Sequence, residues 1–351
     1  MVKNKTTTLI SAVVVSTFLL SGCNLFGNEV QKKIDPPKDV TITKDSSTKA
    51  KEASGNKADV QETVKTELYL IDKDGYVVPQ TLALPKKTSV ATQALEYLVA
   101  DGPVSELLPN DFRAVLPAGT DVSVNIDKDG VASVDFSKEF KNYKKADEMK
   151  ILQSITWTLT QFPTVKNVKL SMAGKELSEM PVGGSPISEN LTRAAGINLD
   201  TSNVMDITNT KPVTVYFIGG EEGSYYYVPV TRRVNNNVED NIAAVVDELV
   251  KGPNQSSNLV TDFMPDVKLL EAPKVENGKV TLNFNENVFG SFEEKMISQH
   301  LLDSLVLSLT EQKGIEQVAV LVKGKAELVN EKGKKVTEPV SRPEKVNTGS
   351  F

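Results

Sequence analysis

Two separate parts of the chain carry the alternating apolar and polar residues of half-buried β-strands. Apolar strands open at residues 67–71 (ELYLI) and again at residues 214–218 (TVYFI). Residues 120–126 (TDVSVNI) alternate strictly, and Asp129-Gly130 supplies turn residues directly afterwards. Period-two alternation bounded by such residues predicts strands joined in hairpins.

Helical spacing of apolar residues follows the opening strand in both parts. In the second part the spacing is i, i+3, i+4, i+7 and i+8, which places one apolar stripe against a core; its members are Ile242, Val245, Val246, Leu249 and Val250. Gly-Pro, a stop signal for helices, ends both stretches, at residues 102–103 and 252–253. The pattern predicts helices from Ser89 and from Asn241, and later helices over residues 148–161 and 294–312.

These elements form an internal repeat with a period of about 150 residues. Val78-Pro79 matches Val228-Pro229, Asp111-Phe112 matches Asp262-Phe263, and GVASVDF from Gly130 matches GKVTLNF from Gly278. Asp135 of the first copy corresponds to Asn283 of the second, so the copies have diverged. The predicted organisation is a first domain over residues 64–185, a linker over 186–210, a second domain over 211–340 and a tail over 341–351.

Each copy has the element order β-β-α-β-β-α-β. That order predicts an α+β fold in which two helices cover one face of a mainly antiparallel sheet.

The first residues have the pattern of a secretory signal. Lys3 and Lys5 precede an apolar stretch over residues 9–20, too short for a membrane-spanning helix. Leu20-Ser21-Gly22-Cys23 then resembles the bacterial lipobox, which implies cleavage before Cys23 and a covalent diacylglycerol on its thiol, to which an N-acyl chain such as palmitate can be added. The alternative is an ordinary secretory signal, residues 1–22, with an incidental Cys23. Because Cys23 is the only cysteine, the chain has no intramolecular disulfide.

Residues 23–63 are rich in Lys, Asp, Glu, Ser and Thr and poor in large apolar residues, which predicts a disordered tether between anchor and domains. The chain carries a formal charge of −6. An acidic balance disfavours nucleic acid as a partner, and it also disfavours electrostatic attachment to an anionic membrane. Membrane attachment is therefore expected through the lipid.

A lipobox, a charged tether and two copies of a unit with ELYLID, DGP and VASVDFS together resemble a GerM-type sporulation and germination lipoprotein of endospore-forming bacteria, with tandem GerMN domains. The resemblance implies a noncatalytic envelope protein related to the ring-building modules of secretion and sporulation channels. It implies sporulation membrane proteins as partners, in the channel complex between mother cell and forespore, with self-association as a further possibility. It places the protein on the outer leaflet of the cell membrane, facing the extracytoplasmic or intermembrane space.

Catalytic and metal-binding interpretations find little support in the residues. The single histidine, His300, has no counterpart in the first copy, and the pattern favours an ordinary helical position. Asp72-Lys73-Asp74-Gly75 and Asp127-Lys128-Asp129-Gly130 begin like calcium loops, but they lack the later ligands and are better explained as hairpin turns. We expect no catalytic residue, no metal and no cofactor apart from the lipid.

The aromatic residues offer candidate docking surfaces. Tyr225, Tyr226 and Tyr227 would alternate across a strand, and Trp157 lies in a predicted helix. Packing within the domain is the more common role for such residues, and partner binding is the alternative.

Two functions of different class remain. The first is a lipid-anchored scaffold, for which we expect two independent domains without a deep pocket. The second is an extracytoplasmic lipoprotein that binds a small ligand or a peptidoglycan fragment, for which we expect a cleft with convergent polar groups between the domains. A hydrolase that uses paired carboxylates is a weaker third.

Overall fold

The computed structural model describes residues 42–43, 62–204, 207–291 and 293–348. The predicted signal peptide, Cys23 and most of the predicted tether lie outside these residues. No helix in the described part is both long enough and apolar enough to cross a membrane.

The first repeat opens with a long antiparallel hairpin, formed by β2 (Thr63–Asp72) and β3 (Val77–Pro85). Two short strands, β1 (Ile42–Thr43) and β4 (Phe112–Arg113), pair with β2. The remaining elements are α1 (Val90–Glu96), β5 (Val122–Ile126), β6 (Val131–Phe136), α2 (Glu148–Leu159), β7 (Asn167–Met172) and β8 (Lys175–Glu176), with 3-10 turns at Pro103–Glu106, Lys138–Lys141 and Lys145–Asp147.

The second repeat follows the same order. Its hairpin consists of β9 (Thr210–Gly219) and β10 (Tyr226–Asn235). The corresponding later elements are α3 (Asn241–Lys251), β11 (Lys274–Glu276), β12 (Lys279–Phe284), α4 (Gln299–Thr310) and β14 (Gln317–Val322). The additional elements are β13 (Met296–Ile297), β15 (Leu328–Asn330), β16 (Lys335–Val336), β17 (Val340–Ser341) and a 3-10 turn at Glu286–Val288. A further 3-10 turn, Arg193–Ala195, lies in the segment between the repeats.

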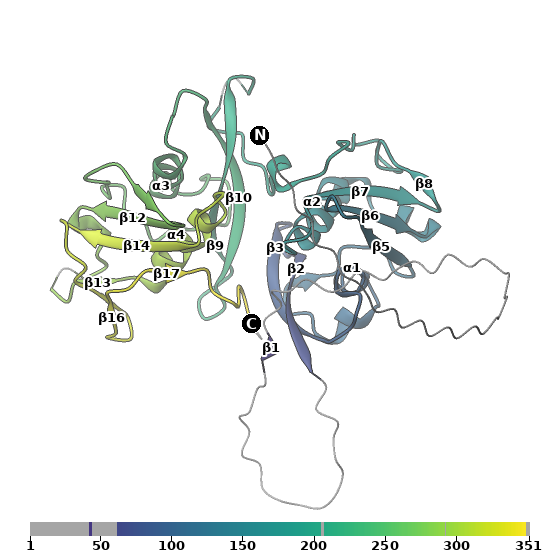
Figure 1. Cartoon of the computed structure of the whole chain (residues 1–351), viewed down its shortest axis with the longest axis horizontal. Coiled ribbons are helices and arrows are strands. Elements are labelled where there is room, and N and C mark those ends of the chain that lie inside the picture. Colours follow the sequence, from purple (N-terminus) through teal and green to yellow (C-terminus); the bar gives the residue numbers. More distant parts are fainter. Residues whose placement is uncertain (1–41, 44–61, 205–206, 292, 349–351) are drawn as a thin grey trace, which may run out of the picture. The chain divides into compact units, whose positions relative to one another are not determined.

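The predicted α+β class and the order of elements are confirmed, but the strands of each repeat do not form one sheet. The first hairpin forms a sheet together with β1 and β4, and the second hairpin forms a sheet by itself. The later strands form a separate sheet, β5-β6-β7-β8 in the first repeat and β11-β12-β14-β17 in the second. The second helix of each repeat lies between the two: α2 contacts β2 and β7, and α4 contacts β9 and β14 (Figure 1). The helix therefore packs on both sheets.

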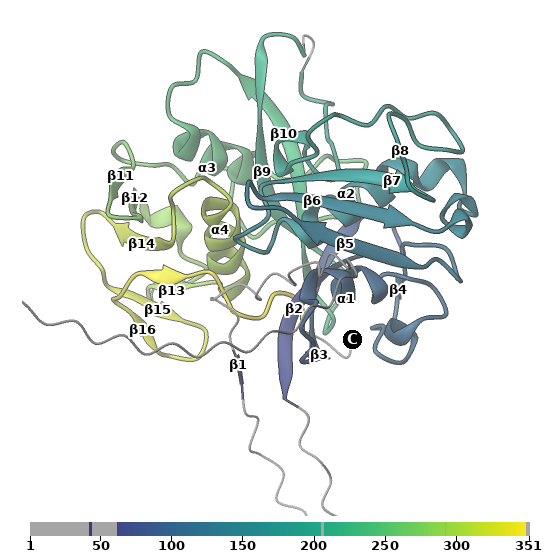
Figure 2. The same ribbon diagram turned by 45° about the vertical axis from the view of Figure 1, so that its right-hand side comes forward.

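Each second sheet is mainly antiparallel, as the sequence predicted, but its central strand pair is parallel. β6 pairs in parallel with β7, and β12 with β14, because a crossover helix returns the chain in the same direction. Figure 2 shows β5, β6 and β7 as neighbours in this sheet. The apolar alternation along a strand is the same for both pairings, so the sequence pattern could not distinguish them.

Polar side chains attach the second helix to the hairpin in both repeats. The backbone N–H of Tyr69 donates to Thr158 Oγ1 at 3.1 Å, and the N–H of Tyr216 donates to Ser308 Oγ at 2.8 Å. α4 begins at Gln299, later than predicted, because Met296–Ile297 pairs with β15 and Ser298 caps the helix by accepting from the N–H of Leu301.

Candidate functional site at the junction of the two repeats

Each repeat is followed by a short segment that lies against the hairpin of the other repeat. After the first repeat, Ile197 exchanges hydrogen bonds with Thr231 of β10: the N–H of Thr231 donates to the Ile197 carbonyl at 2.8 Å, and the N–H of Ile197 donates to Thr231 Oγ1 at 2.9 Å. After the second repeat, Val346 makes the equivalent pair with Thr81 of β3, at 3.1 and 2.8 Å. The two segments are thus exchanged reciprocally.

Two asparagines complete this exchange, each bonding to β3 and β10 at once. Asn198 accepts from the N–H of Val77 and donates to the carbonyls of Val77 and Pro229, all at 2.8 Å. Asn347 accepts from the N–H of Tyr227 and donates to the carbonyls of Tyr227 and Pro79, also at 2.8 Å.

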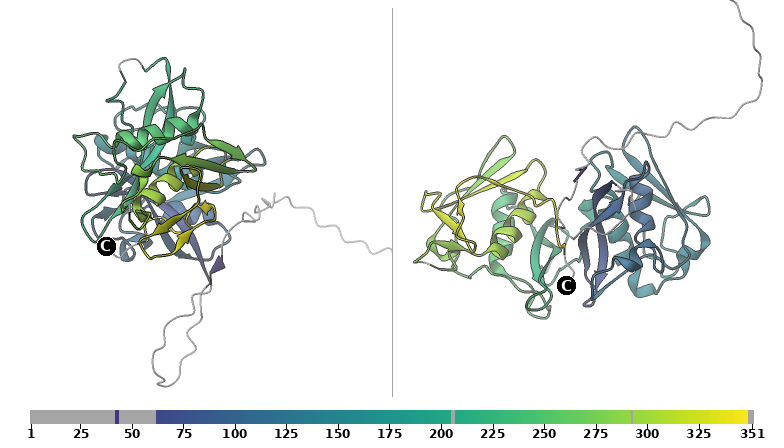
Figure 3. Two further views of the ribbon diagram at one scale, coloured as in Figure 1. Left: turned by 90° about the vertical axis from the view of Figure 1, so that its left-hand side faces the viewer. Right: turned by 90° about the horizontal axis from the view of Figure 1, so that it is seen from below.

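The two prolines explain why side chains make this connection. Pro79 and Pro229 occupy the facing strands β3 and β10, which lie side by side (Figure 3). A proline has no N–H, so these strands cannot form a regular ladder at that point. The Nδ2 groups of the asparagines supply donors to the two proline carbonyls instead. Both asparagines adopt positive φ values, 45° and 53°, which this residue type tolerates better than most.

The exchanged segments share a sequence pattern that the sequence-based prediction did not include. Thr192-Arg193 stands five residues before Asn198, and Ser341-Arg342 stands five residues before Asn347, with Ile197 or Val346 preceding the asparagine. These residues fall in the stretches that we assigned to a linker and a tail. The pattern is Ser or Thr, Arg, any three residues, Ile or Val, Asn, with the same spacing in both segments. Only four of its seven positions match, which is too few to be noticed without the structure.

The two arginines meet around one carboxylate. Arg193 and Arg342 pair with Glu311 at 2.8 and 3.2 Å, and Glu311 is only 8% exposed. Burial by itself would raise the pKa of Glu311, but the two guanidinium groups outweigh it and hold the pKa below its ordinary value. Arg193 also lies 4.4 Å from the centre of the Trp157 ring. Because Arg193 and Trp157 come from the first repeat and its following segment, Glu311 couples the two repeats electrostatically.

A buried tyrosine forms a further contact between the repeats. Tyr226 is 3% exposed, its hydroxyl donates to Asp72 Oδ2 at 2.9 Å, and its ring lies edge-on to Phe112 at 5.1 Å. Burial raises the pKa of Asp72, against the hydrogen bonds from Tyr76 and Tyr226 that lower it.

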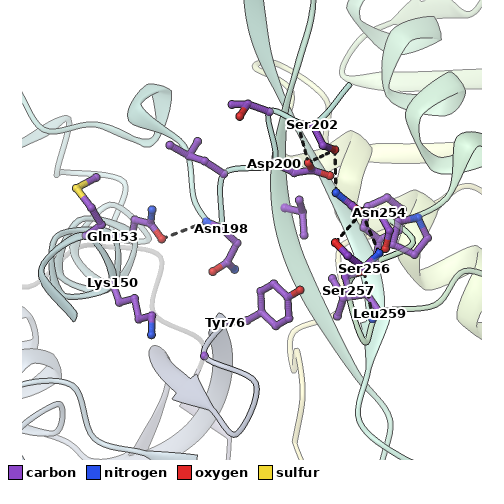
Figure 4. Close-up of a pocket in the computed structure, with 17 residues that line it drawn as sticks. Tyr76, Lys150, Gln153, Asn198, Asp200, Ser202, Asn254, Ser256, Ser257 and Leu259 are labelled. Atoms are coloured by element: carbon purple, nitrogen blue, oxygen red, sulfur yellow. Dashed lines mark hydrogen bonds between the residues drawn. The ribbon is translucent and has the colours of Figure 1, made fainter. Parts of the chain in front are cut away.

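A cavity of about 560 Å³ lies beside Asn198, with walls from both repeats (Figure 4). The first repeat contributes Tyr76, Lys150 and Gln153, and the second contributes the loop of Asn254, Ser256 and Ser257. Asp200 and Ser202, on the exchanged segment, connect to this loop through a hydrogen bond from Asn254 Nδ2 to Ser202 Oγ at 2.9 Å.

The aromatic candidates have different environments. Trp157 is 1% exposed and donates from its indole N–H to the Gly196 carbonyl at 3.3 Å, so it packs inside the chain. Tyr226 is buried as described. Tyr227 is half-buried and donates to Asp303 Oδ2 at 2.9 Å. Tyr225 is 40% exposed and lies edge-on to His300 at 5.3 Å, so it alone of the four presents a large open surface.

His300 belongs to a small polar cluster with Tyr227 and Asp303. The Tyr227 hydroxyl lies 3.2 Å from His300 Nδ1, and burial raises the pKa of Asp303 against the hydrogen bond from Tyr227. This geometry orients Tyr227, and in the part of the chain that the structure describes no serine or threonine hydroxyl is hydrogen-bonded to the histidine. Across the described residues, no group of three or more His, Cys, Asp and Glu side chains is arranged to hold a metal ion.

The two calcium-like stretches are hairpin turns. Asp72 Oδ1 accepts from the N–H of Tyr76 at 2.7 Å, and Asp127 Oδ1 accepts from the N–H groups of Asp129 and Val131 at 2.9 Å. Gly75 and Gly130 have φ values of 87° and 88°, which a turn of this kind requires. The lipobox residues Leu20, Ser21, Gly22 and Cys23 lie outside the described residues.

The geometry departs from the expectation that a scaffold would show two independent domains without a pocket between them. The repeats are joined by the asparagine bonds to the carbonyls of Pro229 and Pro79, by the Arg193–Glu311 ion pair and by the Tyr226 contact. Independent domains were expected because the sequence analysis assigned the exchanged segments to a linker and a tail, which would make no contact with the other repeat.

Comparison with known proteins finds the same tandem organisation. The family described as "Germane: Sporulation and spore germination" matches residues 67–178 and 214–328. The chain is 57% identical over 353 residues to the spore germination protein GerM of Bacillus subtilis strain 168, covering 96% of both chains. It is also similar to the solved structure of the tandem GerMN domains of the sporulation protein GerM from Bacillus subtilis, at 61% identity and a TM-score of 0.78, covering 82% of this chain and 99% of that one.

Proposed function

This chain belongs to the Germane family of sporulation and spore germination proteins, and we propose that it is a noncatalytic envelope scaffold that acts in sporulation and later in germination. The reciprocal exchange of segments between the repeats is the observation that carries the proposal. It gives the tandem domains a fixed relative orientation, so that each domain presents its outer surfaces at a defined distance from the other. A fixed pair of surfaces suits a protein that holds partners in register.

The proposal includes a lipid anchor. In it, the thiol of Cys23 carries a diacylglycerol, and the protein sits on the outer leaflet of the cell membrane of a spore-forming bacterium. Two acyl chains hold a protein stably on a membrane, whereas one holds it weakly. Residues 23–63 then act as the tether that lets the tandem domains reach across the space between mother cell and forespore.

The partners in this proposal are sporulation membrane proteins of the channel complex between the two cells. The test is affinity purification of the full chain, after mild cross-linking, from sporulating cells and from vegetative cells of matched density. We expect membrane proteins made only during sporulation to copurify. Recovery of the same proteins from both cultures, or of soluble proteins alone, would contradict the proposal.

Anchoring is tested by the Cys23→Ser variant, with Ser21→Ala as its matched control within the lipobox. We expect the wild type and Ser21→Ala to fractionate with membranes and to incorporate labelled palmitate. Cys23→Ser should lose the label, because a serine hydroxyl does not replace the thiol in the modification. Retention of the label by Cys23→Ser would show that Cys23 is not the modified residue.

Ligand or peptidoglycan binding is the second candidate function, and the cavity beside Asn198 is the observation that favours it. The two functions are compatible, because the cavity occupies a small part of the surface.

A further inference from the structure

The duplication places a tyrosine at two equivalent positions of the junction, but only one of the two rings is buried against the other repeat. Val78-Pro79 corresponds to Val228-Pro229, so Tyr76 corresponds to Tyr226. Tyr226 is buried against Asp72 and Phe112 of the first repeat. Tyr76 is half-buried and faces the cavity instead.

The difference arises from the loop that each tyrosine meets. Tyr226 meets Phe112, whose large ring closes the position. Phe263, the counterpart of Phe112, is 4% exposed and does not line the cavity, where Asn254, Ser256 and Ser257 take its place. The space that an aromatic ring fills on one side is therefore open on the other, where both polar side chains of this loop and apolar side chains such as Phe217 and Leu259 line it.

The carboxylate of the cavity is neutralised, and its one ammonium is compensated in part. Arg232 pairs with Asp200 at 3.1 Å, and Ser202 donates to the same carboxylate. Lys150 pairs with Asp147 at 3.3 Å, but Asp147 also pairs with Arg113 at 2.9 Å. A cationic ligand would need an uncompensated anion, and a phosphate would need more than one partly compensated cation, so the cavity favours a ligand that is neutral or carries a single acidic substituent.

Hydrogen-bond donors and acceptors remain available beside the ring. Gln153 uses its Oε1 to accept from the N–H of Asn198 at 3.1 Å, and among the described residues no acceptor is bonded to its Nε2. Lys150 uses one of its three donors, and the Ser256 hydroxyl, which donates to Asn254 Oδ1, keeps acceptor capacity. In Figure 4, Tyr76 projects between the Lys150 and Gln153 side and the Asn254 side.

Apolar surface lies at the edge of the same cavity. Met149 and Leu199 line it and are 47% and 49% exposed. The cavity thus combines the ring of Tyr76, an apolar wall that includes Phe217 and Leu259, and several hydrogen-bonding groups. A sugar has the complementary surface, because its ring presents C–H groups on one face and hydroxyls that both donate and accept at its edge. At about 560 Å³ the cavity also falls in the size range of small-ligand sites.

We propose that this cavity binds a sugar unit of a glycan, with the Tyr76 ring against the C–H face of the sugar and with Lys150, Gln153 and Ser256 bonded to its polar substituents. The inference rests on the second candidate function, ligand binding at this cavity, and it does not depend on the scaffold role.

The test is isothermal titration of the full chain in mild detergent with two soluble probes, the trimer of N-acetylglucosamine and cellotriose. We expect saturable binding of at least one trimer. Tyr76→Ala and Lys150→Ala should each weaken it, Tyr76→Ala by about tenfold or more, because it removes the stacking face. Tyr225→Ala removes a tyrosine from the corresponding hairpin outside the cavity and should leave the affinity unchanged.

Circular dichroism of each variant separates loss of binding from loss of fold, and Lys150→Ala, at a partly exposed side chain, is the variant that leaves the core untouched. Absence of saturable binding of both trimers at concentrations up to about 10 mM would overturn the proposal. Binding that survives both Tyr76→Ala and Lys150→Ala, or that Tyr225→Ala abolishes equally, would also overturn it, because the site would then lie elsewhere.

Discussion

The asparagine connections between the repeats can be tested by removing one of them. In Asn347→Ala, three hydrogen bonds of 2.8 Å are lost, and the N–H and carbonyl of Tyr227 and the carbonyl of Pro79 lose their partner. Asn347 is 9% exposed, so water replaces these bonds poorly. At about 0.5–1.5 kcal/mol for each bond, the loss is about 3 kcal/mol.

Backbone strain needs a separate control, because alanine is less tolerant than asparagine of positive φ. Asn347 has a φ of 53°, and Asn277 has a φ of 50° in the exposed turn between β11 and β12. Asn277→Ala therefore carries the same conformational cost, about 1 kcal/mol, without any contact between repeats. The difference between the two variants isolates the connection.

The assay is urea denaturation of the full chain in mild detergent, followed by two probes. Trp157 is the only tryptophan and reports on the first repeat, whereas far-ultraviolet circular dichroism reports on both. We expect the probes to give coincident transitions in the wild type and in Asn277→Ala, and separate transitions in Asn347→Ala. If Asn347→Ala is no more destabilising than Asn277→Ala and its transitions stay coincident, the reasoning is refuted.

Three further outcomes follow from single residues. Desolvation acts to raise the pKa of Glu148, but hydrogen bonds from Ser185, Gly183 and Tyr143 lower it to about 2. The ionised Glu148 side chain therefore stabilises the fold fully above the unfolded pKa of about 4.3, and this stabilisation disappears as the pH falls toward 2. Glu148→Gln should flatten that part of the curve of unfolding free energy against pH. Gly130→Ala should lower the free energy of unfolding by about 1–3 kcal/mol more than Gly174→Ala, as measured by thermal denaturation. The reason is that a Cβ at Gly130 would lie 2.9 Å from the Thr164 carbonyl oxygen, while one at Gly174 meets nothing within 4 Å. Equal losses of stability in the two variants would contradict this. Trp157→Leu should lower the free energy of unfolding by about 2–4 kcal/mol, because it leaves a cavity and removes the contact with Arg193. The measurement is the urea midpoint from circular dichroism, and an unchanged midpoint would show that the site repacks.

The sequence by itself determined the repeat, the order of elements within it and the hairpin turns. These features depend on neighbouring residues, such as the alternation in residues 120–126 or the glycines that turns at Gly75 and Gly130 require. The predicted helix over residues 148–161 contains α2 for the same reason, since its apolar stripe is local.

Tertiary structure decided how the strands divide between sheets and how the repeats join. A strand pattern records which residues are buried, not whether they pack against a helix or pair in parallel, so the split into two sheets was not visible. The junction depends on residues far apart in the chain: Asn347 bonds to Pro79, and Arg193 pairs with Glu311. Each of these residues alone is an ordinary polar residue in a polar stretch. Those residues gain their role only when the exchanged segments lie on the opposite hairpins. There the asparagines meet the proline carbonyls, and the two arginines meet the buried carboxylate of Glu311.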